Sequence, residues 1–155
     1  MFVLDALRGF AADVQATSCL VLDVDHVPEA AVLALRDHLA RYQHLIHATH
    51  ADRPDDRCLR VVVKLSRPVA PREWKPFIRA AVAMAGVPVD SPTIDIGRLF
   101  YLPSRPRDAD YFVDARTGDA LDVDALLATM EPAQRACNHQ LYDDSSAVQP
   151  PGAES

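Results

Sequence analysis

A valine-rich segment, residues 57–65, constrains the fold of this chain more than any other stretch. Its sequence is Arg-Cys-Leu-Arg-Val-Val-Val-Lys-Leu, and a run of β-branched and aliphatic residues of this length is typical of a strand. Apolar segments at 18–24 and 44–49 predict two earlier strands, and residues 98–102 predict a fourth, which ends where Pro103 breaks the chain. We therefore expect a sheet built around the 57–65 strand.

Two helices are predicted between these strands. The first opens at Pro28 and extends to about Arg41, because proline suits a first turn and apolar residues recur there with helical spacing. The second covers 71–85, where Pro71 opens it and Gly86 stops it. The order strand, helix, strand, strand, helix, strand predicts an α+β fold of split βαβ (RRM-like) topology, an antiparallel sheet with both helices on one face.

The domain is expected to cover residues 1–130, followed by a C-terminal extension, 131–155, that is largely disordered from about 143. A short helix at 2–10, an edge strand at 110–114 and a last helix at 123–130 complete the domain. No run approaches the ~20 apolar residues of a membrane span, and the first ten residues do not resemble a signal peptide. These features predict a cytoplasmic protein with no membrane partner. The three cysteines form no Cys-x-x-Cys pair, which disfavours disulfides and a structural zinc site.

Charge is divided unevenly along the chain. Residues 53–107 contain eleven of the sixteen Lys and Arg but five of the twenty-two Asp and Glu, a local balance of +6 within a chain of net charge −6. A basic segment inside an acidic chain is what phosphate binding at one face would require. A solvated basic face would give the same count.

The strand at 18–24 runs into two carboxylates, Asp23 and Asp25, separated by one residue. Because strand side chains alternate between faces, both should point the same way, ~7 Å apart. They are expected in the middle of the sheet, on the face that the helices leave open to a ligand. Two such carboxylates repel each other unless a cation lies nearby. The pair therefore suits a divalent metal, and a solvated strand end is the alternative.

Histidines and basic residues on the neighbouring strands extend this constellation. His44, His47 and His50 are spaced by three, which fits a helix face better than a strand, so one histidine binding phosphate or moving a proton is favoured over zinc. The basic side chains that could clamp anionic oxygens are Arg60, Lys64, Arg67 and Arg98. The polar face of a half-buried strand would look the same. The sequence has no Gly-rich phosphate loop.

These features together resemble the catalytic core of the archaeo-eukaryotic primase (AEP) superfamily, in particular the primase-polymerase domains of phages and plasmids. The resemblance covers about residues 15–125. It is carried by Leu-Asp-Val-Asp at 22–25, Thr-His at 49–50, Arg-Val-Val-Val-Lys-Leu-Ser-Arg-Pro-Val at 60–69, Val-Asp at 89–90 and Arg-Leu-Phe-Tyr-Leu-Pro-Ser at 98–104. It departs from the family at Ala48, where a serine is usual two residues before the histidine, although Thr49 offers a hydroxyl next door.

The resemblance implies a two-metal nucleotidyltransferase that initiates or extends primers on single-stranded DNA with Mg²⁺ or Mn²⁺. Asp23, Asp25 and Asp90 would be the catalytic metal ligands, with Asp95 as the alternative third ligand. His50 would contact the phosphates of the incoming nucleoside triphosphate, and the four basic residues named above the triphosphate or the template. A helicase or a helical primase domain acting in trans is the implied partner.

Two other functions compete with this interpretation. A catalytically degenerate module of the same fold would bind nucleotide or nucleic acid without joining nucleotides, which the lack of a following helical domain favours. A rolling-circle initiator or relaxase shares the sheet topology and would use Tyr101, Tyr111 or Tyr142 as nucleophile. Its histidine pair normally flanks one apolar residue, whereas two residues separate His47 from His50.

Overall fold

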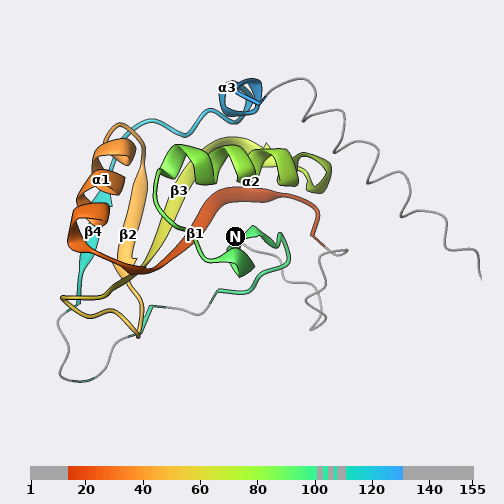
Figure 1. The fold of residues 1–155 in the computed structure, drawn as a ribbon. Helices are drawn as coiled ribbons and strands as arrows, with labels where there is room; N and C mark the ends of the chain where they lie inside the picture. Colours follow the sequence, from red (N-terminus) through yellow and green to blue (C-terminus); the bar gives the residue numbers. More distant parts are fainter. Residues whose placement is uncertain (1–13, 101–102, 105–106, 108–110, 131–155) are drawn as a thin grey trace, which may run out of the picture.

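A four-stranded antiparallel sheet forms the centre of the molecule, with helices packed on one of its faces (Figure 1). The structure is a computed structural model that describes residues 14–100, 103–104, 107 and 111–130. The strands are β1 (Thr17–Val27), β2 (His44–Ala48), β3 (Arg57–Val69) and β4 (Val113–Arg116), and the helices are α1 (Glu29–Leu39), α2 (Pro71–Ala85), α3 (Val123–Ala128) and the 3₁₀ turn η2 (Ser91–Ile94). Within these described ranges no helix is long and apolar enough to cross a membrane. The predicted α+β fold is confirmed, while the expected helix at 2–10 and extension at 131–155 lie outside the described residues.

The sheet has the order β1-β3-β2-β4, which corrects two predictions. The strand expected at 98–102 does not form over its described part, 98–100, and the fourth strand is instead the predicted edge strand, shifted to Val113–Arg116 beside β2. Consequently β1 and its two aspartates lie at an edge of this sheet rather than in the middle. The reason is that residues after α2 take other partners: the Asp90 N–H bonds the Asp23 carbonyl oxygen at 2.8 Å, and the Phe100 ring lies 4.9 Å from the Arg60 guanidinium carbon.

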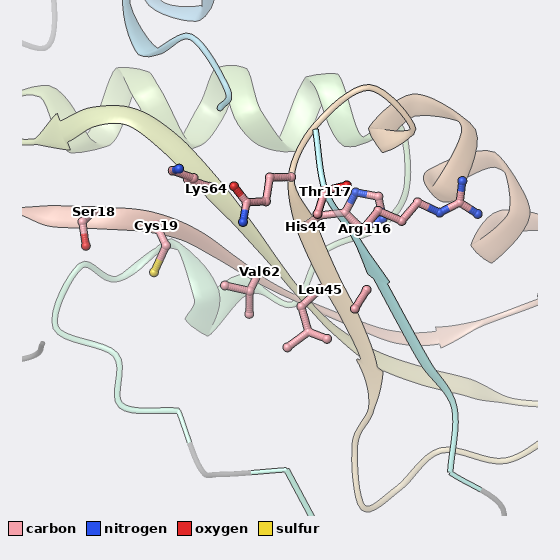
Figure 2. Close-up of a pocket in the computed structure, with 10 residues that line it drawn as sticks. Ser18, Cys19, His44, Leu45, Val62, Lys64, Arg116 and Thr117 are labelled. Atoms are coloured by element: carbon pink, nitrogen blue, oxygen red, sulfur yellow. The ribbon is translucent and has the colours of Figure 1, made fainter. Parts of the chain in front are cut away.

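Alternation along the long strands separates an apolar face from a functional one. On β3, Leu59, Val61 and Val63 are fully buried under the helices, while Arg60, Val62 and Lys64 point the other way and are more accessible. Figure 2 shows Cys19, Leu45 and Val62 projecting from β1, β2 and β3 on the side away from α2. The face left open by the helices therefore exists as predicted.

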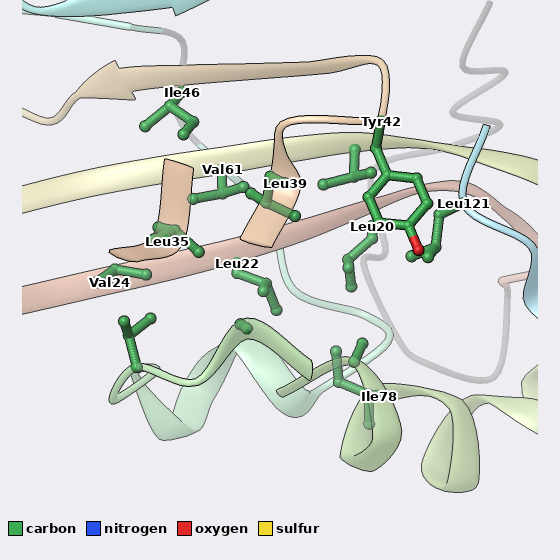
Figure 3. Close-up of a cluster of buried hydrophobic side chains, with 14 of the residues drawn as sticks. Leu20, Leu22, Val24, Leu35, Leu39, Tyr42, Ile46, Val61, Ile78 and Leu121 are labelled. Carbon is green, nitrogen blue, oxygen red and sulfur yellow. The ribbon is translucent and has the colours of Figure 1, made fainter. Parts of the chain in front are cut away.

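The hydrophobic core lies between the sheet and the two long helices (Figure 3). Leu20, Leu22, Leu35, Phe77 and Ile78 are each at most 1 % exposed and come from β1, α1 and α2. Full burial of one such side chain stabilises the fold by about 1.5–3 kcal/mol. This packing fixes the direction in which the opposite face of β1 and β3 presents its polar groups.

The ends of α2 agree with the sequence pattern. The helix begins at Pro71, where the Glu73 carboxylate accepts a hydrogen bond from the Ala70 N–H at 3.2 Å. It ends at Gly86, whose φ of 67° is left-handed, and a Cβ there would approach His38 Cε1 to 2.8 Å. The sharp stop sends the chain back along β1 toward Asp90.

Candidate active site

A β-bulge at the end of β1 sets the position of Asp25. Val24 pairs with Leu59 and Val27 with Arg57, so β1 carries one residue more than β3 over this interval. The extra length is taken up at His26, whose φ of 57° is left-handed. Bulges re-aim the side chains next to them. Asp25 is thereby held beside Asp23 at the rim of the open face.

Asp23 forms a buried ion pair with Arg60 on the neighbouring strand. Arg60 Nε donates to Oδ1 at 2.6 Å and Nη2 to Oδ2 at 3.1 Å, and Asp23 is 4 % exposed. The two residues are direct cross-strand partners. The Asp23 backbone turns its N–H and carbonyl away from β3, so this is a non-hydrogen-bonded pair, in which side chains lie closest. Arg60 therefore supplies the positive charge that offsets the repulsion between the carboxylates of Asp23 and Asp25.

The segment after α2 docks on the free edge of β1 and brings Asp90 to the same place. The Asp90 N–H donates to the Asp23 carbonyl oxygen at 2.8 Å, and the Asp23 N–H donates to the hydroxyl of the buried Thr93 at 3.3 Å. Both backbone groups that β1 would leave unpaired at Asp23 are thus satisfied. Asp90 is positioned by backbone hydrogen bonds rather than by its own side chain.

A cavity of about 230 Å³ collects these side chains at the end of the sheet. Its lining consists of Asp23, Asp25, His26, Thr49, Ala51, Cys58, Arg60, Asp90 and Arg98. We call it the acidic cavity. Three carboxylates and two arginines in one small volume can bind a cation and an anion side by side.

The electrostatics of the acidic cavity disfavour the charged form of Asp25. Its pKa is raised, first by burial and then by the negative charges of Asp23 and Asp90, while His26 and the Cys58 thiol act in the opposite direction. A divalent cation between these carboxylates would remove the repulsion. The charge state of the site therefore fits a metal ion.

The oxygen donors also fit magnesium or manganese, with one restriction. In the part of the chain that the structure describes, no three His, Cys, Asp or Glu side chains stand together as ligands of one ion, and both oxygens of Asp23 bond Arg60. Mg²⁺ is commonly held by one or two carboxylates and completes its shell with waters and substrate phosphates. Asp25 and Asp90 could hold such an ion, and Asp23 could join them only if Arg60 released it.

Not every predicted site residue lines the acidic cavity. Asp95 is exposed and accepts a hydrogen bond from the Gly97 N–H at 2.9 Å, so Asp90 is the carboxylate that accompanies Asp23 and Asp25. His50 is exposed in the turn after β2, between the lining residues Thr49 and Ala51. Lys64 lies farther along β3, and Arg67 bonds Glu73 and Asp124.

The remaining histidines and the tyrosines have other surroundings. Within the described residues, His44 and His47 bond backbone carbonyls and form no zinc cluster. Tyr111 stacks on His47, with ring centroids 6.4 Å apart, and lies outside the acidic cavity. Tyr101 and Tyr142 lie outside the described residues.

Sequence reasoning did not find three contributors to the site. Cys58 lies two residues before Arg60, and the alternation of side chains along a strand could have placed both on one face. Thr93 and Phe100 act through tertiary contacts, to the Asp23 backbone and the Arg60 guanidinium, for which the sequence carries no local signal.

The fold places the chain among proteins with a primase-polymerase-like core. A solved structure, the AEP domain of the cyanophage S-2L primase-polymerase (PrimPol), matches with a TM-score of 0.58 and 14 % sequence identity. The match covers 79 % of this chain and 65 % of the cyanophage chain, so less than two thirds of that domain has a counterpart here. A likeness at this identity concerns the fold.

The family follows from the sequence itself. The model of the VapE N-terminal domain matches residues 3–136, most of the chain, and the protein belongs to this family. A search of curated proteins found no significant match. The suspected relationship to the AEP superfamily is thus supported by a family match and by a structural one.

Proposed function

We propose that the protein is a metal-dependent nucleotidyltransferase of the primase-polymerase type, which initiates or extends primers on single-stranded DNA in phage or plasmid replication. One observation carries this proposal: Asp23, Asp25 and Asp90 converge with Arg60 and Arg98 in one cavity at the end of a primase-polymerase-like sheet. Nucleotidyl transfer needs both signs of charge at such short range, because a cation and a triphosphate meet at the reacting centre.

The carboxylates and arginines of the acidic cavity each have a role in this reaction. Asp25 and Asp90 would hold Mg²⁺ or Mn²⁺, which when bound activates the attacking 3′ oxygen and stabilises the leaving pyrophosphate. Arg98 is exposed at the cavity and is placed to neutralise the triphosphate. No nucleophilic side chain is required, since the attacking group belongs to the primer.

Arg60 connects the two functions of the site, which are binding of the metal ion and binding of the triphosphate. Its guanidinium now bonds both oxygens of Asp23 and lies against Phe100. A triphosphate entering the cavity offers stronger anionic oxygens to the same guanidinium fork. Exchange of Arg60 from Asp23 to phosphate would free Asp23 as the third carboxylate, so nucleotide binding would complete the metal site.

Primer extension on single-stranded DNA with labelled nucleotides and either ion tests this function. Replacing Asp25→Asn or Asp90→Asn should lower the rate at least ~100-fold, because each tenfold corresponds to about 1.4 kcal/mol and a catalytic ion contributes several. The matched control is Asp55→Asn, which removes a carboxylate from an exposed turn outside the acidic cavity. Full activity in the Asp25 variant would contradict the proposal.

Thermal unfolding provides a second measurement that does not depend on turnover. An ion bound only by the folded state stabilises it by about 2.7 kcal/mol at 100 times its dissociation constant. Mg²⁺ or Mn²⁺ should therefore raise Tm in the unmodified protein and in Asp55→Asn, but not in Asp25→Asn.

A nucleotide-binding module without catalysis is the second candidate. The closed Asp23–Arg60 pair and the exposed His50 favour it, because both leave the site less complete than the AEP resemblance implies. Such a module would bind nucleotide or DNA equally well in EDTA and would show no extension with either ion. It would retain the fold and lose the metal-dependent rise in Tm.

A further inference from the structure

The two edges of the sheet differ in what covers them. At the β1 edge, the Asp90 N–H and the Thr93 hydroxyl bond the backbone of Asp23. At the other edge lies β4, which pairs with β2 alone among the described strands. Figure 1 shows β4 at the side of the molecule, beyond β2. An edge strand with unpaired backbone groups is a template for a further strand.

Hydrogen bonding to β2 determines which backbone groups of β4 point outward. The Ala48 N–H donates to the Phe112 carbonyl oxygen at 2.9 Å, and hydrogen-bonded pairs alternate along an antiparallel ladder. Every second residue from Phe112 therefore turns its N–H and C=O groups toward β2, whereas Val113 and Ala115 turn theirs outward. Both of these residues are exposed, and no backbone hydrogen bond from the described part of the chain reaches their outer groups.

Exposed apolar side chains accompany this edge on both faces of the sheet. Val113 is 50 % exposed on the open face, and Leu33 is 50 % exposed on α1. Leu33 lies one turn before Arg36 on the same stripe of α1, and Arg36 Nε donates to the Asp114 carboxylate of β4 at 2.6 Å. That stripe of α1 therefore lies toward β4. A protein chain seated on this edge would remove apolar surface from water on both faces.

The charges of β4 select a second copy of the same strand as the partner. Asp114 and Arg116 lie two residues apart, both on the helix side of the sheet. If two copies of β4 pair antiparallel about a two-fold axis at Ala115, Asp114 of each copy lies directly opposite Arg116 of the other. These are non-hydrogen-bonded pairs, in which side chains lie closest, and opposite charges there are favourable. An axis one residue earlier or later would oppose like charges.

We propose that β4 pairs with β4 of a second copy of this chain, antiparallel about a two-fold axis at Ala115, so that two four-stranded sheets form one continuous sheet. In the single chain, Arg116 is exposed and its Nε bonds Asp114 at 3.2 Å. In the pair, this guanidinium bonds Asp114 of the other copy, while Arg36 keeps its own bond to that carboxylate. Such an interface is self-complementary, as a two-fold axis requires. No residue of β4 lines the acidic cavity, which stays accessible.

Sedimentation velocity over a range of protein concentrations tests the inference. We expect the unmodified protein to show a monomer–dimer equilibrium. In Ala115→Pro the dissociation constant should rise at least ~10-fold, because both copies lose an N–H donor at the axis. The fold should persist, since a proline is tolerated where the N–H of an edge strand points outward. Ala115→Thr, which keeps the N–H, is the matched control and should dimerise as the unmodified protein does.

A charge reversal tests the register. Arg116→Glu would place a carboxylate opposite Asp114 on both sides of the axis, so dimerisation should weaken at least ~10-fold at low salt. The difference should shrink as salt screens the repulsion. Arg72→Glu, the same change at an exposed position of α2, should leave the dissociation constant unchanged.

Disulfide cross-linking by an added oxidant gives the register directly. In Ala115→Cys the two thiols lie at the axis, in a hydrogen-bonded pair whose Cα atoms are ~5.5 Å apart, within the range a disulfide spans. In Val113→Cys, on the same edge and face, the two copies of the residue are offset by four positions, ~13 Å along the strand, which is too far. We expect a covalent dimer from the first variant and, as in the unmodified protein, none from the second.

Several outcomes would overturn the inference. A monomer at every concentration would do so, as would a dimer that Ala115→Pro leaves unchanged at native Tm, because another surface would then join the copies. If the proline variant does not fold, the cross-link decides: no covalent dimer from Ala115→Cys, or an equal yield from Val113→Cys, contradicts the proposed register. None of these measurements involves nucleotide or metal, so their result is independent of the proposed function.

Discussion

The acidic cavity and the exposed Lys64 farther along β3 share one sheet face but differ in how far their charges are already satisfied. In the acidic cavity Asp23 and Arg60 are desolvated and bonded through two hydrogen bonds, and backbone contacts hold Asp90. Lys64 is exposed and engages no carboxylate among the described residues. Buried, paired charges position groups for chemistry, whereas exposed cations provide affinity that depends on salt. The comparison indicates that the end of the face around Asp23 is organised for a reaction, whereas Lys64 contributes a solvated charge.

The largest stability effect should come from Arg60→Ala. The change leaves Asp23 buried without its cation, and breaking one partner of a buried pair costs about 3–5 kcal/mol. Urea unfolding in metal-free buffer measures the loss. If Arg60 and Lys64 differ as described, Lys64→Ala should change the unfolding free energy by no more than about 0.5 kcal/mol.

The double variant Asp23→Asn/Arg60→Ala tests the cause of that loss. Removing the carboxylate's charge along with its partner should recover much of the stability, because a buried neutral amide is less costly than an unpaired carboxylate. Equal losses in the single and double variants would mean that Arg60 acts through packing against Phe100 instead.

A smaller effect, of opposite sign, is expected for Asp25→Asn without metal. Burial and the charges of Asp23 and Asp90 raise the pKa of Asp25 in the folded state, so the folded protein keeps this proton at pH values where the unfolded chain has lost it. The unmodified protein therefore loses stability as pH rises from about 3.9, the unfolded value, through the folded pKa. The variant should be the more stable one above that window and equal to the unmodified protein below it.

Unfolding curves at several pH values, with Asp55→Asn as control, check this expectation. The other titratable groups around Asp25 are Asp23, Asp90, His26 and Cys58, and all are unchanged in the variant. A variant less stable than the unmodified protein at neutral pH would show that Asp25 is stabilised where it lies, which would argue against a metal site.

Local pattern predicted those parts of the fold that depend on burial and on chain stops. The strands at 18–24, 44–49 and 57–65 and the helix at 71–85 all formed, because alternation, helical spacing and Gly86 act within a few residues. The fourth strand was predicted at the wrong residues because strand pairing depends on contacts between segments that are far apart in the sequence. Phe100 packs against the Arg60 guanidinium, while Val113–Arg116 pairs with β2.

The candidate site likewise has a part that local pattern predicted and a part that depends on tertiary contacts. Asp23 and Asp25 could be placed together from the two-residue period of a strand, and Asp90 joins them as the resemblance implied. The Arg60–Asp23 pair required the register of β1 on β3, and the Thr93 contact required the docking of a loop, neither of which the sequence shows. Metal ligation by the three aspartates, and the contacts of His50, Lys64, Arg67 and Arg98 with nucleotide or template, stay predictions.

The smallest effect should come from the fourth basic position of β3, Arg67→Ala. Arg67 bonds Glu73 at 2.8 Å and Asp124 at 2.7 Å, joining β3 to the helices away from the acidic cavity. Pairs this exposed contribute little to stability, and less in high salt. The hydrogen bond from Arg67 lowers the pKa of Glu73, so the contribution is present above the unfolded glutamate value of about 4.3 and disappears as pH falls through the folded pKa. Urea unfolding at neutral and acidic pH should show a small loss that vanishes in acid.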